Sequence, residues 1–259
     1  MTGSTGALLL LADGRLPTGG HAHSGGLEEA VAAGRVRDAA TLAAWLSGRL
    51  ATTGRVDAAL AAAAAAAAAA TAATTATTAT TAVPKAATTA EHPPERIKFL
   101  DAEAAARCPS PALRKASRAQ GRGLLRAARR MWPDPGLDAL FAWRADGVMW
   151  PVALGAVGAA IDAKPIEVAT LAAQASVSGP AWAATRLLGL DPFAVARCLA
   201  DLAPQVDTVA GHAADAGTHA AAAAEANAGP DCDLDAYGAP LSEIGAQLHA
   251  AWEVRLFAS

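Results

Sequence analysis

The segment between residues 8 and 30 constrains the fold most, because it contains two helical patterns separated by a short glycine-rich turn. It reads LLLLADGRLPTGGHAHSGGLEEA. Pro17 fixes its own φ and disfavours a helical conformation just before it, so the first helix, predicted over 7–13, ends ahead of it. Ser24 can cap a second helix, predicted over 24–33. The segment therefore predicts a helical hairpin whose turn displays polar side chains.

Composition extends this prediction to the whole chain. Of the 259 residues, 53% are apolar and only 4% aromatic, and alanine dominates. This favours closely packed helices over a β-sandwich, so the predicted fold class is all-α. The net charge of −3 gives no general electrostatic reason to expect nucleic acid or an anionic membrane as the partner. Three cysteines without a CxxC pair fit a reducing cytoplasm.

The middle of the chain changes character. Residues 58–70 are almost pure alanine, 71–89 alternate alanine and threonine, and prolines follow. We predict a low-complexity insertion at about 58–96, of which 58–70 can extend as a helix but is too short and too weakly hydrophobic to cross a membrane. The N-terminal apolar run is also short and lacks a basic flank, so we expect no signal peptide. Further helices are predicted over 39–51, 111–132, 151–160, 166–177, 179–188, 191–210 and 240–259.

The helix predicted over 111–132 has the strongest charge pattern. On a helical wheel its seven cations fall within an arc of about 160°, with no acidic residue among them. They are Arg114, Lys115, Arg118, Arg122, Arg126, Arg129 and Arg130. Such a stripe indicates either an acidic partner or bound phosphate, or internal pairing with Glu28, Glu29 or the acidic C-terminal region. Gly121 and Gly123 predict a close helix crossing or a bend.

Common catalytic motifs are missing from the sequence. It contains no GxxxxGK[ST] phosphate loop, no HExxH pair and no GxSxG elbow. His21 and His23 are two residues apart, and Asp13, Glu28 and His212 could complete a metal shell, but this spacing is weak evidence. We therefore predict neither an enzyme nor a tight metal site.

Four segments resemble the UreF family of urease accessory proteins. They are the hairpin with its extension, 8–34; the run SRAQGRGLLR at 117–126; the run PVALGAVGAA at 151–160; and the C-terminal RLFAS at 255–259. The resemblance implies a single all-α domain over 1–259, a bundle of roughly eight to ten helices carrying the insertion. It also implies a non-catalytic, cytoplasmic scaffold without a tightly bound cofactor. The scaffold would form a homodimer, bind UreD (also called UreH) and recruit the GTPase UreG, in a complex that delivers nickel to apo-urease.

The resemblance also assigns partner-binding residues at matching positions. It places an interaction face at the hairpin, a GTPase contact on the basic helix and a docking segment at the C-terminus. The residues are Gly19, Gly20, His23, Ser24, Gly26 and Glu28; Arg118, Gln120, Arg122 and Arg126; and Arg255 and Phe257.

Two other classes stay open. A helical nucleic-acid-binding protein would place its basic stripe on phosphates, and its affinity would fall steeply with salt. A nickel-binding chaperone in its own right would use His21 and His23, and would retain stoichiometric metal when isolated. The scaffold predicts neither behaviour.

Overall fold

The computed structural model describes residues 5–18, 23–81, 93–225 and 234–257, and within these ranges it contains helices and no strand. The helices are α1 (Thr5–Ala12), α2 (Leu27–Ala32), α3 (Ala39–Arg49), the π-helical segment Leu50–Gly54, α4 (Arg55–Thr81), α5 (Glu95–Ala106), α6 (Pro111–Met131), α7 (Pro135–Trp143), α8 (Trp150–Ala160), α9 (Pro165–Leu188), α10 (Pro192–Glu225) and α11 (Pro240–Ala250). Because α3, the π-helical segment and α4 are continuous, the described residues form ten helices, as an all-α bundle predicts.

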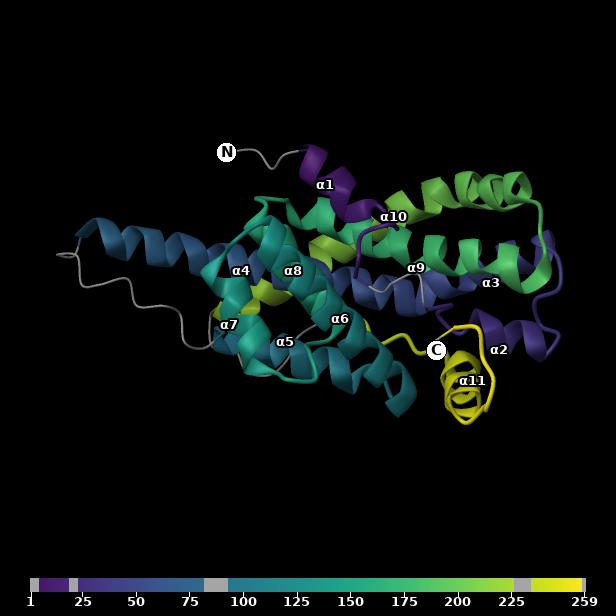
Figure 1. Cartoon of the computed structure of the whole chain (residues 1–259). Coiled ribbons are helices and arrows are strands. Elements are labelled where there is room, and N and C mark those ends of the chain that lie inside the picture. Colours follow the sequence, from purple (N-terminus) through teal and green to yellow (C-terminus); the bar gives the residue numbers. More distant parts are fainter. Residues whose placement is uncertain (1–4, 19–22, 82–92, 226–233, 258–259) are drawn as a thin grey trace.

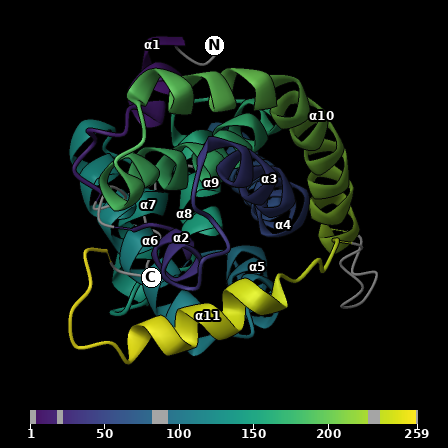
Figure 2. The same ribbon diagram turned by 90° about the vertical axis from the view of Figure 1, so that its right-hand side faces the viewer.

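Helix α4 forms the centre of the bundle. Seen end-on in Figure 2, it is surrounded by α5, α8, α9 and α10. The alanine side chains from Ala58 to Ala65 are at most 2% exposed. A helix that is apolar on every side is typical of a buried core, and alanine lets its neighbours approach closely. Gly217 of α10 lies in such a close approach, because an added Cβ would lie 2.6 Å from the Ala59 carbonyl oxygen.

The predicted insertion at about 58–96 is therefore wrong at its beginning. Alanine has no polar face that could reveal periodicity, so a core helix made of it resembles low-complexity sequence. Helix α4 continues to Thr81 and α5 begins at Glu95. The remainder of the predicted insertion, 82–92, lies outside the described residues.

One helical stretch, 39–72, is apolar and long enough to cross a membrane by length and composition alone. Its most apolar window is 56% buried inside the fold. A core helix of a globular protein has the same character, so this stretch gives only weak evidence for a membrane span.

Two long helices contain an internal proline and extend beyond their predicted bounds. The predicted break between 177 and 179 is wrong, because α9 continues through the buried Pro180. Helix α10 likewise contains Pro204 and extends to Glu225, beyond the predicted end at 210. Both helices pack along α4, and this tertiary packing outweighs the local cost of a proline in a helix.

Helix α2 of the N-terminal hairpin and the C-terminal segment meet on one side of this bundle. The N-terminal hairpin lies between α9 and α11, since α2 contacts both helices. Helix α11 crosses the outside of the fold, and the C-terminal segment turns back toward α2 (Figures 1 and 2). Helix α6 carries Gly121 and Gly123 at close approaches, since a Cβ on either would overlap a backbone carbonyl oxygen, of Val148 and Thr18 respectively. These glycines thus mark close approaches of α6 to the backbone just before α8 and to the hairpin turn, rather than the predicted crossing of two helices.

Candidate functional site

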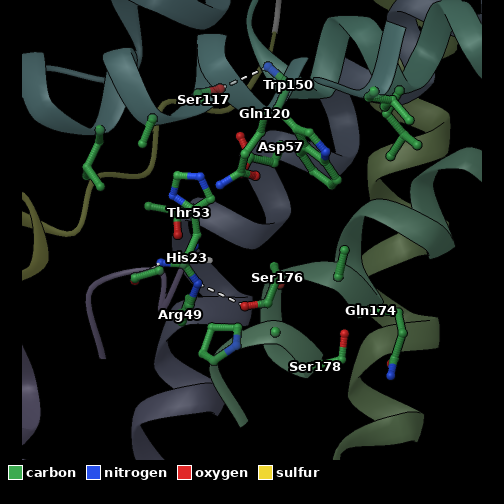
Figure 3. Close-up of a pocket in the computed structure, with 18 of the residues that line it drawn as sticks. His23, Arg49, Thr53, Asp57, Ser117, Gln120, Trp150, Gln174, Ser176 and Ser178 are labelled. Atoms are coloured by element: carbon green, nitrogen blue, oxygen red, sulfur yellow. Dashed lines mark hydrogen bonds between the residues drawn. The ribbon is translucent and has the colours of Figure 1, made fainter. Parts of the chain in front are cut away.

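A cavity of about 640 Å³ lies where the hairpin turn, the continuous α3–α4 helix, α6, α8, α9 and the C-terminal segment meet. Its wall is mostly apolar, with a small group of polar side chains that Figure 3 shows gathered around one space. This size and this mixture are typical of a ligand pocket. The polar residues labelled there are His23, Arg49, Thr53, Asp57, Ser117, Gln120, Gln174, Ser176 and Ser178.

A polar stripe of three residues follows the α3–α4 helix along the cavity. Arg49, Thr53 and Asp57 are spaced four residues apart, and all three line the cavity. Spacing of i, i+4 and i+8 places side chains on one helical face. The π-helical segment 50–54 lies within this stripe. Single turns of π-helix often mark functional sites, because the wider turn is less stable than α-helix.

Two charges of this stripe affect each other. Burial raises the pKa of the Asp57 carboxyl to about 6, although the Arg49 guanidinium opposes this rise. Burial also lowers the pKa of Arg49, while the Asp57 carboxylate opposes that shift. The same desolvation raises the pKa of the nearby Cys108 thiol to about 11. Cys108 is therefore a thiol at neutral pH and a poor nucleophile.

Arg49 also connects the hairpin to the bundle through two hydrogen bonds. Its Nη1 donates to the Gly25 carbonyl oxygen at 2.8 Å, and its Nε donates to the Ser176 carbonyl oxygen at 2.9 Å. Gly25 has φ of +61°, and its neighbour Gly26, at φ of +91°, is the N-cap of α2. Glycine fits both positions because other residues rarely adopt positive φ. The hairpin turn is thus fixed against the cavity wall.

Glu28 joins the two ends of the chain. Its carboxylate is 7% exposed and receives three hydrogen bonds, all from the C-terminal region. His249 Nε2 lies 2.9 Å from Oε2, the Leu256 N–H donates to Oε1 at 2.8 Å, and the Phe257 N–H donates to Oε2 at 2.9 Å. Ser24 Oγ accepts the Glu28 N–H at 3.3 Å, so the predicted cap acts two residues ahead of the N-cap position.

Phe257 is the buried anchor of the C-terminal segment. It is 4% exposed, lines the cavity and lies under the Arg186 guanidinium, 4.9 Å from ring centroid to Cζ. Leu256 beside it is 72% exposed. Of these two terminal side chains, only that of Phe257 is packed into the body.

The basic helix α6 is largely paired inside the chain, but not with the predicted acids. Arg118 donates to buried Asp101 at 3.2 Å and to the Gly147 carbonyl oxygen at 2.9 Å. Arg122 and Arg129 both lie over the Phe141 ring at 4.4 Å. The partners thus come from α5, α7 and the following loop, rather than from Glu28, Glu29 or the C-terminal region. Among the described residues, Lys115, Arg126 and Arg130 remain exposed and without a hydrogen bond or ion pair.

The predicted partner-binding residues are distributed over three places. His23 and Gln120 line the cavity, Ser24 and Glu28 are buried beside it, and exposed Arg255 donates to the Ala250 carbonyl oxygen at 3.3 Å. Gly19 and Gly20 lie outside the described residues. Contact of any of these residues with a partner protein stays a prediction.

Sequence reasoning missed the polar stripe. Arg49, Thr53 and Asp57 recur at four-residue intervals, but Thr52 and Arg55 between them are polar as well, so the spacing alone does not distinguish this face. For metal binding, the described part of the chain contains no group of three or more His, Cys, Asp or Glu side chains that could hold an ion.

An exposed apolar surface lies next to the C-terminus. Leu241, Ile244 and Leu248 follow one face of α11 and are 58–70% exposed. Val254 and Leu256 continue this apolar character at 85% and 72% exposure. We call these five residues the C-terminal apolar surface. The opposite face of α11, with Gly245, Ala246 and His249, is buried against the body.

Fold and site together define an all-α helical bundle with a central alanine helix and a polar cavity between its chain ends. The family model of UreF matches residues 36–203. The urease accessory protein UreF of Mycolicibacterium vanbaalenii is 40% identical over 99% of both chains, and that of Mycobacterium sp. strain JLS is 43% identical over 97% of both. The UreF of Mycobacterium marinum is 38% identical over 97% of both chains. The chain belongs to the UreF family of urease accessory proteins.

Proposed function

We propose that this protein is a non-catalytic scaffold in urease maturation, joining UreD (UreH) and the GTPase UreG in the complex that delivers nickel to apo-urease. Membership of the UreF family supports the accessory role. In this proposal the protein works in the cytoplasm as a homodimer within the complex, and nickel is cargo of the assembly rather than a resident cofactor.

The C-terminal apolar surface is the observation that carries the proposal. Five large apolar side chains, each more than half exposed, lie on one short helix and the segment after it. Exposure of such side chains to water is unfavourable, because burying one of them contributes about 1.5–3 kcal/mol of free energy. Contiguous apolar surface on a soluble protein is typical of a protein interface. We assign this surface to UreD.

A copurification experiment tests this assignment. The triple variant Leu241→Ser, Ile244→Ser and Leu248→Ser removes apolar area without touching the buried face of α11. We expect it to lose UreD in a pull-down while keeping wild-type helicity by circular dichroism. The matched control is Phe193→Ser, which removes an 84% exposed apolar side chain from α10. Retention of UreD by the triple variant would refute the assignment.

We assign recruitment of UreG to the exposed cations of α6. Of the predicted GTPase contacts, Arg126 has an exposed side chain that makes no hydrogen bond or ion pair within the described part of the chain. Arg130 lies one turn further on. Charge reversal by Arg126→Glu plus Arg130→Glu leaves the internal pairs of Arg118 intact. We expect this variant to keep UreD and lose UreG, and a variant that still recruits UreG would remove the assignment. The pair Arg122→Glu and Arg126→Glu is a less selective test, because Arg122 also packs on Phe141.

A further inference from the structure

The polar stripe in the cavity has no role in the scaffold described above, and two of its three side chains, those of Thr53 and Asp57, make no hydrogen bond within the described part of the chain. Thr53 Oγ1 is buried without a hydrogen bond. The Asp57 carboxylate and the Gln120 amide likewise make no hydrogen bond within the described part of the chain. A buried polar group left unsatisfied costs about 1–3 kcal/mol, so the buried Thr53 hydroxyl, with the half-buried Asp57 and Gln120 side chains lining the same space, indicates a site that a ligand completes.

The backbone supports the same location. The α3–α4 helix widens into its π-helical turn at residues 50–54, directly between Arg49 and Asp57. Gly54 allows this wide turn to pack on α9, because an added Cβ would lie 2.6 Å from Ser176 Oγ. The irregular turn therefore lies in the stretch of helix whose Arg49, Thr53 and Asp57 side chains line the cavity.

Charge indicates what the ligand carries. Arg49 is the cation whose charge acts on Asp57, but its side chain donates hydrogen bonds to the carbonyl oxygens of Gly25 and Ser176 rather than to Asp57. The pKa of Asp57 is raised even so, which shows that the charge of Arg49 does not compensate fully for burial. A second cation that brings its own N–H donors would complete the site.

The remaining wall indicates the shape of the ligand. Val56, Leu60, Leu124 and Met149 line the cavity together with the Trp150 ring. Such a wall accommodates an aliphatic chain, while aromatic rings also attract organic cations. We propose that the cavity binds an alkyl chain that ends in a guanidinium or ammonium group, with the cationic end at Asp57, Thr53 and Gln120. The proposal concerns the isolated chain and does not depend on the scaffold function.

Binding of n-butylguanidinium chloride to the full-length protein at pH 7.5 tests the proposal by titration calorimetry. We expect saturable binding of n-butylguanidinium and none of n-butanol, which has the same chain without the charge. Asp57→Asn should weaken binding at least tenfold. The control Asp201→Asn, which removes an exposed carboxylate on α10, should leave it unchanged.

Equal binding by Asp57→Asn and the wild type, or binding of n-butanol as strong as that of n-butylguanidinium, would overturn the proposal. Should Asp57→Asn fail to fold, Thr53→Val removes only the hydroxyl and is expected to weaken binding severalfold; unchanged binding would again overturn the proposal.

The ligand group belongs either to a free small compound or to a lysine or arginine side chain of a partner protein. Loss of probe binding in a purified complex with UreD identifies the side chain, and retained binding identifies the free compound.

Discussion

Replacing Glu28 by glutamine should release the C-terminal segment while leaving the bundle folded. The carboxylate accepts from His249 Nε2 and from the main-chain N–H groups of Leu256 and Phe257. A glutamine has one oxygen in place of two, so its NH₂ group must face at least one of these donors. The charge-assisted character of every remaining bond is lost as well.

The magnitude follows from these contacts. A hydrogen bond to a charged group contributes about 1.5–3 kcal/mol, and Glu28→Gln removes at least one such bond. Since 1.4 kcal/mol corresponds to a tenfold change in an equilibrium constant, local opening of the segment should become about 10–100 times more frequent.

Hydrogen exchange measured by NMR or by mass spectrometry of C-terminal peptides reports this opening. The amides of Leu256 and Phe257 should lose protection by that factor, while amides of the buried helix α4 keep theirs. Glu243→Gln is the matched control, because Glu243 also accepts a main-chain N–H, from Ala239, but does not hold the segment. Unchanged protection at Leu256 and Phe257 in Glu28→Gln would show that Glu28 does not hold this segment.

Two further predictions concern the core and the cavity. Gly121→Ala should destabilise the protein by at least about 2 kcal/mol, because its Cβ would overlap the Val148 carbonyl oxygen. Gly48→Ala has open space around it and should stabilise the protein by up to about 1 kcal/mol. Thermal unfolding should therefore show melting temperatures shifted in opposite directions for the two variants. For Asp57 the folded pKa, about 6, is above its unfolded value, so ionising this carboxyl costs more in the folded protein than in the unfolded chain. The protein therefore keeps its full stability below about pH 4, where the carboxyl is protonated, and loses part of it as the pH rises through 6. Urea unfolding should therefore show wild type losing up to about 3 kcal/mol relative to Asp57→Asn between pH 4 and 7.5, and a difference independent of pH would contradict the cavity electrostatics.

Much of the fold could be predicted from local patterns. The basic helix was predicted over 111–132 from its charge pattern and observed as Pro111–Met131, where the Ser110 cap and the proline in the first turn also favour its start. The alanine helix could not be placed in the core, because its role depends on partners such as Gly155 and Gly217 that come from distant helices. The bounds of α9 and α10 were mispredicted for the same reason, since both helices pack along α4 and long-range packing decides how far they extend.

The candidate site was predicted less completely. The sequence located both ends of the chain as special, but it could not show that Glu28 binds the C-terminal segment, because the pairing spans more than 220 residues. Arg49, Thr53 and Asp57 were overlooked because each falls in a separate local pattern. Their shared helical face becomes apparent only once α3 and α4 are known to be one continuous helix.

Copurification with UreD and UreG, followed by size-exclusion chromatography with light scattering, tests the scaffold role most directly. The account predicts a stable complex with two copies of this chain, which UreG joins only when UreD is present. A chain that elutes alone and binds neither protein would contradict the scaffold role, and salt-dependent binding of nucleic acid would then be the next measurement.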